Sequence, residues 1–106
     1  MFTVKIMNEF IHSPLWIYDE DGIIDEPEFI ANDARLQDLC SKVENIFSSY
    51  YEFDSHNEPC WFNHEKEKAE KNIMLKLIFC IKERLDEINE GNFVVEDLET
   101  ERLKNL

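Results

Sequence analysis

Apolar side chains recur at steps of three and four residues in two long segments, the spacing of one face of an α-helix. The first segment follows Asn32 and ends near Tyr51. Its apolar positions are Leu36, Leu39, Cys40, Val43, Ile46, Phe47 and Tyr50. They predict an amphipathic helix of about five turns, at roughly 3.6 residues per turn. Asn32 is a suitable N-cap, and Asp33 in the first turn interacts favourably with the helix dipole.

The second segment predicts a longer helix. Asn63 is suited to cap its first turn, and Gly91 lies where a C′ residue follows the last turn. The apolar stripe between them consists of Ile73, Met74, Leu77, Ile78, Ile81, Leu85 and Ile88. Leu75 and Phe79 widen this stripe. We therefore expect neighbouring elements to cover this helix on more than one side.

The N-terminal part of the chain has the pattern of β-strands. Residues 2–6 alternate between apolar and polar side chains, as in a half-buried strand. The apolar runs 15–18 and 23–24 then flank the sequence Asp-Glu-Asp-Gly, which predicts a β-hairpin. Gly22 is able to take the φ > 0 position that closes such a turn.

The remaining segments complete the predicted fold. Residues 53–59 are predicted to form a loop between the helices, residues 92–95 a last strand, and residues 96–104 a short helix. The fold class is α+β, with a small antiparallel β-sheet packed against an antiparallel pair of long helices, because this arrangement buries both apolar stripes. A chain of this length forms one domain, residues 1–106.

The formal net charge of −13 is large for 106 residues. It repels nucleic-acid phosphates and attracts basic proteins, so we expect a basic protein partner and no direct binding of nucleic acid. The segment 1–10 lacks the pattern of a secretory signal, and no apolar run has the length of about 18 residues that a membrane span needs. Three cysteines without a CxxC motif fit a reducing compartment. We therefore expect a cytoplasmic protein that does not bind membranes, with a monomer favoured.

The predicted hairpin is the main candidate for a binding site. It contains six carboxylates and no Lys or Arg; the carboxylates are Asp19, Glu20, Asp21, Asp25, Glu26 and Glu28. Aromatic rings beside carboxylates are the mixture that anchors and steers a protein interface. The predicted partner-binding residues here are Trp16, Tyr18, Asp19, Glu20, Asp21, Asp25 and Glu26.

Two other interpretations of the hairpin stay open. Charged residues at a sheet edge prevent pairing with other chains, so the hairpin is also explained as a solvated, protective turn. The stretch 19–26 resembles a fragment of a calcium-binding loop as well. It lacks the EF-hand spacing of ligands, however, and we predict no metal site.

A second mixture of rings and carboxylates brackets the predicted loop between the helices. Its rings are Tyr50, Tyr51, Phe53, Trp61 and Phe62. Glu52 and Asp54 are the partner-binding candidates in this group. The rings either close the core or form an exposed patch. If this loop and the hairpin share one end of the molecule, the two groups form one acidic and aromatic surface.

Motifs for metal binding or catalysis are weak or missing. His56, Cys60 and His64 recur every four residues, but Pro59 interrupts a helix through them and a zinc site needs a fourth ligand. The sequence lacks a nucleophile elbow and an HExxH motif, and two glycines are too few for a phosphate-binding loop. We predict no enzymatic activity and no cofactor. A thiol or metal enzyme is the third-ranked alternative.

Several stretches of the chain resemble small acidic immunity proteins of contact-dependent inhibition and related polymorphic toxin systems. They are residues 14–22, 51–54, 58–62 and 92–98. The resemblance extends along most of the chain, although these families share no common signature. It implies a cytoplasmic antidote that binds the C-terminal domain of one cognate toxin, often a basic nuclease, and blocks it. The alternative is an acidic regulatory or adaptor protein, including a nucleic-acid mimic, that acts on an endogenous basic partner.

Overall fold

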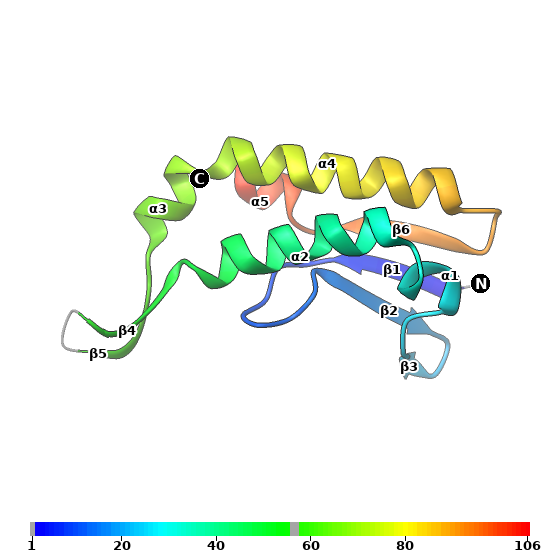
Figure 1. Ribbon diagram of the computed structural model, residues 1–106, viewed down its shortest axis with the longest axis horizontal. Coiled ribbons are helices and arrows are strands. Elements are labelled where there is room, and N and C mark those ends of the chain that lie inside the picture. Colours follow the sequence, from blue (N-terminus) through cyan, green and yellow to red (C-terminus); the bar gives the residue numbers. More distant parts are fainter. Residues whose placement is uncertain (1, 56–57) are drawn as a thin grey trace.

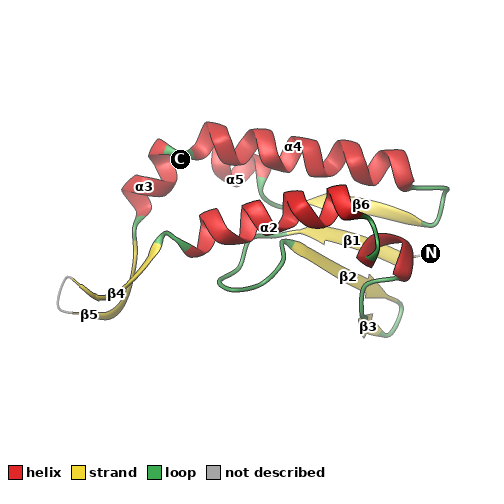
Figure 2. Ribbon diagram, in the orientation of Figure 1, coloured by secondary structure: helices red, strands yellow, loops and turns green. Residues whose placement is uncertain are grey.

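The chain forms a four-stranded sheet, a separate two-stranded hairpin and five helices within the described residues (Figures 1 and 2). The computed structural model describes residues 2–55 and 58–106. The strands are β1 (Phe2–Ile6), β2 (Leu15–Asp19), β3 (Gly22–Ile23), β4 (Tyr51–Ser55), β5 (Glu58–Phe62) and β6 (Phe93–Asp97). The helices are α1 (Glu28–Ala31), α2 (Ala34–Ser48), α3 (His64–Ala69), α4 (Lys71–Ile88) and α5 (Thr100–Lys104). The fold is therefore of mixed α and β class.

The main sheet is mixed, so the prediction of a purely antiparallel sheet was wrong. Its strand order is β3-β2-β1-β6. The β3-β2 and β2-β1 pairs are antiparallel, whereas β1 and β6 are parallel, with Phe2 beside Phe93 and Ile6 beside Asp97. Parallel neighbours need a long crossover connection. Here residues 7–92 form this connection, and α4 is the helix that precedes β6.

One face of the sheet is buried against the helices. Val4 and Ile6 of β1 and Leu15 and Ile17 of β2 are at most 4% exposed, as the alternation of a half-buried strand requires. The same core contains residues of α2 and α4, which contact each other. These helical core residues are Leu36, Cys40, Val43, Phe47, Met74, Ile78, Ile81 and Leu85.

Helix α2 begins one residue later than predicted. Asp33, and not Asn32, is its N-cap, and the Asp33 carboxylate accepts a hydrogen bond of 2.8 Å from the backbone N–H of Leu36. A carboxylate at this position satisfies a backbone donor that has no partner inside the helix.

The second predicted helix is divided in two. Asn63 caps the short helix α3, as predicted, by accepting a hydrogen bond of 3.0 Å from the Lys66 N–H. Glu70 separates α3 from α4, and α4 ends at Ile88, so Gly91 lies in the turn beyond with φ +83°. Among the described residues, no helix has both the length and the apolar content needed to cross a membrane.

Residues 51–55 and 58–62 form the paired strands β4 and β5, so the predicted loop at 53–59 was wrong for the described part of that segment, and residues 56–57 lie outside the described residues. Tyr51 pairs with Phe62 and Phe53 with Cys60. The polar residues and Pro59 in this segment indicated a loop, but a two-stranded hairpin tolerates proline because both of its strands are edges.

Candidate functional site

The β2-β3 hairpin has the conformation that its sequence predicts. Asp19 pairs with Gly22, whose φ is +124°, and the Asp19 carboxylate accepts a 2.7 Å hydrogen bond from the backbone N–H of Asp21. This local bond is an Asx-turn, which fixes the tight connection. Asp19, Glu20 and Asp21 are all exposed. The tip therefore presents three carboxylates to solvent from a defined turn.

Trp16 and Tyr18 lie on the sheet face that points away from α2 and α4. Side chains alternate along a strand, and their neighbours Leu15 and Ile17 belong to the core on the other face. Strand pairing places Tyr18 in one row across this face. The row consists of Ile23, Tyr18, Thr3 and Val94.

This open face carries exposed apolar groups. Ile23 is 66% exposed and Val94 is 51% exposed at the two ends of the row. Between them, the Lys5 ammonium lies 4.6 Å from the centroid of the Tyr18 ring, a cation–π contact. The open face thus combines apolar area with a tyrosine ring held in place by its neighbours, which is the composition of a protein contact surface.

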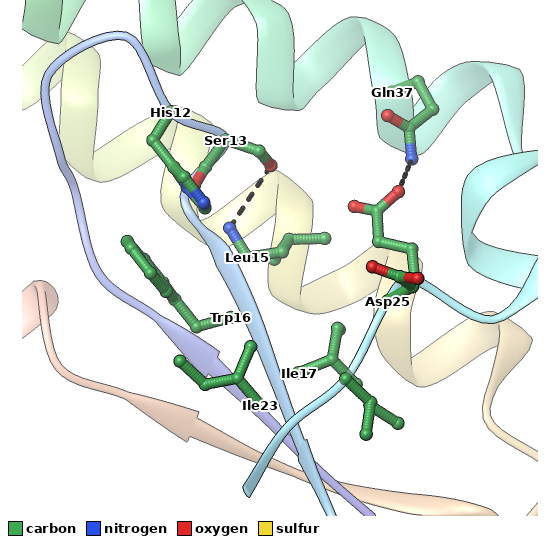
Figure 3. Close-up of a pocket in the computed structure, with 10 residues that line it drawn as sticks. His12, Ser13, Leu15, Trp16, Ile17, Ile23, Asp25 and Gln37 are labelled. Carbon is green, nitrogen blue, oxygen red and sulfur yellow. Dashed lines mark hydrogen bonds between the residues drawn. The ribbon is translucent and has the colours of Figure 1, made fainter.

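The Trp16 ring is fixed by two contacts. Its indole N–H donates a 2.9 Å hydrogen bond to the carbonyl of Met7, and its ring stacks on the His12 ring at 3.9 Å between centroids and 6° between planes. Met7 and His12 both lie in the connection between β1 and β2, and Figure 3 shows His12 beside Trp16. Trp16 is therefore held in position before any partner binds, which lowers the entropy lost in binding.

A pocket of about 380 Å³ opens beside Trp16. Figure 3 shows Trp16, Ile17 and Ile23 around the same hollow as Asp25 and Gln37. The apolar wall contains Leu15, Trp16, Ile17, Ile23 and Ile24, and the polar rim contains His12, Ser13, Asp25, Glu26 and Gln37. Part of the edge of β2 is open here because β3 has only two residues.

The pocket rim is acidic and partly rigid. The side-chain amide of Gln37 donates hydrogen bonds to the Glu26 carboxylate at 3.3 Å and to the Ile30 carbonyl at 3.0 Å, which positions Glu26 at the rim. Asp25 is exposed beside it. Two carboxylates over an apolar wall complement a Lys or Arg side chain, whose aliphatic stem packs on the wall while its charged head pairs at the rim.

The structure brings some predicted binding residues together and separates others. Trp16, Asp25 and Glu26 line one pocket, and Tyr18 with the three tip carboxylates continues from it along β2. The β4-β5 hairpin, which carries Glu52 and Asp54, extends from the opposite end of the long axis from β3 (Figure 1). The two groups therefore do not form one continuous surface.

Glu52 of β4 is hydrogen-bonded to the residue that caps helix α3. Its carboxylate accepts a 2.8 Å hydrogen bond from the side-chain amide of Asn63, the cap of α3. Asp54 also lies in β4, and its side chain is outside the described part of the chain. This end of the molecule thus uses Glu52 to join the hairpin to the start of α3.

Three rings of the second aromatic group, those of Tyr50, Tyr51 and Phe62, pack at one end of the core, whereas Phe53 is 58% exposed. Tyr50 is fully buried, and its ring and the Phe62 ring are 5.9 Å apart in an edge-to-face arrangement. Burial raises the pKa of the Tyr50 hydroxyl, and the nearby Glu70 carboxylate raises it further. Phe10 packs on Tyr51 at 4.6 Å between centroids. Sequence reasoning missed Phe10 because it lies outside the periodic segments.

The zinc and thiol candidates fall only partly within the described residues. They contain no group of three or more His, Cys, Asp or Glu side chains placed to hold a metal. Cys60 is exposed and Cys40 is buried, with burial raising the pKa of the Cys40 thiol to about 12. A thiol with so high a pKa is a poor nucleophile. His56, the first residue of the proposed ligand series, lies outside the described residues.

Comparisons with protein-family models, with curated proteins and with solved structures find no match to this chain. Its function is therefore inferred from the chemistry and placement of its own residues.

Proposed function

We propose that this chain is a non-enzymatic immunity protein, which binds the basic C-terminal domain of one cognate toxin in a stoichiometric complex and blocks its activity. The observation that carries this proposal is the acid-rimmed pocket beside the fixed Trp16 ring, continuous with the carboxylates of the β2-β3 hairpin. The residues that line the pocket include no Lys or Arg. The cation beside them is Lys5, which lies over the Tyr18 ring.

The proposed interface assigns different roles to its two kinds of side chain. Asp19, Glu20 and Asp21 at the exposed tip attract Lys and Arg residues of the toxin and accelerate association. Trp16 and Tyr18 are the anchors that become buried when the complex forms. In this proposal the long helices α2 and α4 form an antiparallel pair behind the sheet. They give the binding face a rigid support.

An acidic adaptor protein, or a mimic of nucleic acid, is the second candidate function. The net charge of −13 favours it as much as the first, because any basic partner is attracted. Genome position separates the two. An adjacent gene for a large secreted toxin supports the immunity function, and a housekeeping operon supports the adaptor.

Affinity capture from the native organism tests the proposal. The tagged protein is incubated with lysate, eluted with salt, and its partner identified by mass spectrometry. The doubly substituted Asp25→Asn, Glu26→Gln protein is the matched control, because it keeps the shape of the rim and removes its charge. We expect one basic protein at near one-to-one stoichiometry, recovered in lower yield with the control.

A second step distinguishes an immunity protein from other binders. The recovered partner is expressed alone and together with this chain in a host that lacks both. Growth arrest that co-expression relieves supports the immunity function. Recovery of a non-toxic housekeeping complex contradicts it and favours the adaptor.

A further inference from the structure

A groove runs between helix α4 and strand β6, at the opposite edge of the main sheet from β3. Its volume is about 590 Å³, and its lining includes Phe79 and Glu83 of α4 and Val94 and Val95 of β6. Phe79 is 59% exposed and Val94 is 51% exposed. A free strand edge beside an apolar groove is the arrangement to which proteins add an extended peptide as a further strand.

The hydrogen bonds at the two ends of β6 define which of its backbone groups are already used. The Phe2 N–H donates to the Asn92 carbonyl at 3.3 Å, and the Leu98 N–H donates to the Ile6 carbonyl at 3.0 Å. In a parallel pair, alternate residues of one strand bond to the other. The backbone N–H and carbonyl groups of Val94 and Glu96 therefore point toward β1. Those of Phe93, Val95 and Asp97 point away from it, toward the free edge of the sheet.

The outward-pointing backbone groups of β6 differ in whether they already have a hydrogen-bond partner. The side-chain amide of Asn89 donates to the Phe93 carbonyl at 2.8 Å, and its oxygen accepts from the Phe93 N–H at 3.4 Å, so Phe93 is capped. Val95 is the next outward residue, and β6 is the last strand of its sheet among the described residues. The Val95 N–H and carbonyl are thus the backbone groups that an added strand would meet first.

The charged residues around the groove favour a basic segment as its occupant. Glu83 and Asp86 lie on α4 and are exposed, while the Lys82 ammonium is paired with the Asp97 carboxylate at 3.1 Å. Glu96 is exposed on the open face of β6. A second copy of this chain would bring these carboxylates against their equivalents. A segment with Lys or Arg residues would instead pair with them.

We propose that the β6 edge and the α4 groove bind an extended segment of a partner protein, with alternating apolar and basic residues, by strand addition. Its backbone pairs with Val95, and its apolar side chains point to the α4 side, where one enters the groove beside Phe79. Its basic side chains point to the open face, where they meet Glu96. Glu83 and Asp86 on α4 add to the attraction for a cationic segment. This binding site lies at the β6 edge of the sheet, whereas the acid-rimmed pocket lies beside β2 and β3. The proposal therefore does not depend on the immunity function.

Binding of a labelled peptide tests this proposal in solution. The probe is a heptapeptide of alternating Lys and Val with blocked ends, and the control peptide has proline in place of the central Val. Fluorescence anisotropy measures the dissociation constant of each. We expect the alternating peptide to bind at least about tenfold more tightly than the control, because proline removes a backbone donor.

Two substitutions on α4 separate groove binding from general charge attraction. Phe79→Arg adds a cation inside the groove, and Ile73→Arg adds the same cation at a position that is 55% exposed on the same helix and outside the groove. We expect Phe79→Arg to weaken binding about tenfold and Ile73→Arg less than about twofold. Equal weakening by both substitutions would overturn the proposal.

Amide hydrogen exchange examines the edge directly, without depending on any variant. In the free protein we expect fast exchange at Val95 and slow exchange at Val94 and Glu96, whose N–H groups face β1. Saturating peptide should slow exchange at Val95. Protection of Val95 in the free protein, or no change on adding peptide, contradicts strand addition. Protection that depends on protein concentration assigns this edge to a second copy of the chain and also rejects the proposal.

Discussion

The guanidinium of Arg84 on α4 donates hydrogen bonds to both carboxylate oxygens of Asp33, the N-cap of α2. The same carboxylate accepts the cap bond from the Leu36 N–H. The Asp33 side chain is only 8% exposed, so these contacts are made away from bulk water. One carboxylate thus fixes the start of α2 and joins it to α4, which lies 51 residues away in the sequence.

Substitution of Asp33 separates its two roles. Asp33→Ala removes the cap and the ion pair, and we expect a loss of about 1–2 kcal/mol in the free energy of unfolding from the cap alone. Asp33→Asn keeps a cap acceptor and removes the charge, so its loss should be smaller than that of Asp33→Ala. Urea denaturation at pH 7 measures both. Equal stabilities of the two variants would show that the cap contributes nothing.

The Arg84–Asp33 pair also predicts a pH dependence. The hydrogen bonds from the Arg84 guanidinium hold the pKa of the Asp33 carboxyl below its usual value. A lowered folded-state pKa contributes stability that is fully present above the unfolded value of about 3.9 and is lost as the pH falls through the folded value. The stability difference between the natural protein and Asp33→Asn should therefore be constant between about pH 5 and about pH 7 and shrink below about pH 4.

Arg102 of α5 pairs with two buried carboxylates. Its guanidinium contacts Glu67 at 2.9 Å and Glu99 at 2.7 Å, and those side chains are 2% and 4% exposed. Burial lowers the pKa of Arg102, but the two carboxylates outweigh it and the net direction is upward. Arg102→Met would leave both carboxylates buried without a cation.

We expect Arg102→Met to lower the free energy of unfolding by about 2–3 kcal/mol, below the full cost of breaking a buried pair because solvent reaches Arg102. Lys104→Met on the same helix removes the same charge from an exposed position and should change stability by less than about 0.5 kcal/mol. Thermal or urea melting of the two variants compares them. Similar melting would indicate that the buried carboxylates do not need Arg102.

The sequence predicted the helices better than the contacts between distant segments. The stripe from Leu36 to Phe47 has a period of about 3.6 residues, and this pattern alone predicts the buried face of α2. The partners Asp33 and Arg84, by contrast, are far apart in sequence, and no local pattern pairs them. The parallel β1-β6 pairing was missed for the same reason, because a short strand does not indicate which neighbour it joins.

The candidate site was predicted in part. Local turn chemistry at Asp19 and Gly22 identified the acidic hairpin correctly, because an Asx-turn and a φ > 0 glycine depend on adjacent residues only. The placement of Glu52 and Asp54 relative to that hairpin depends on the whole fold. Sequence left this question open, and the structure places them at the other end of the molecule.

Core substitutions on α4 test the buried stripe. Ile81 is fully buried, so Ile81→Ala should lower the free energy of unfolding by about 2–5 kcal/mol. Leu77 is only partly buried, and Leu77→Ala should cost less than Ile81→Ala. Ile73 is 55% exposed, and Ile73→Ala should change stability by less than about 0.5 kcal/mol. Urea melting ranks the three variants, and a shift below 0.5 kcal/mol for Ile81→Ala, roughly the size of a surface change, would remove it from the core.

Thiol reactivity distinguishes the cysteines. Burial raises the pKa of the Cys40 thiol to about 12, so at pH 8 this thiol is protonated and inaccessible. Cys60 is exposed. Iodoacetamide should label Cys60 first and Cys40 only after unfolding in denaturant, as peptide mapping by mass spectrometry would show. Labelling of Cys40 at the rate of Cys60 in the native protein would contradict its burial.

The exposed hairpin tip provides the most direct test of how the proposed toxin is recognised. Replacing Asp19, Glu20 and Asp21 together by Ser removes three charges while leaving a hydroxyl able to cap the turn, so the fold should be retained. Association with the captured partner should slow by about tenfold at low salt and lose most of its salt dependence. Stopped-flow fluorescence at two salt concentrations measures the association rate.

A control with the same charge change shows whether position matters. Replacing Glu65, Glu90 and Glu101 by Ser also removes three exposed carboxylates, from sites outside the hairpin. If the hairpin forms part of the interface, this control should slow association much less, because attraction between charges falls off within about 8–10 Å at physiological salt. Equal slowing by both triple variants would mean that net charge alone attracts the partner. Association rates unaffected by the hairpin substitutions would exclude the tip from the interface and leave the pocket beside Trp16 to be tested by itself.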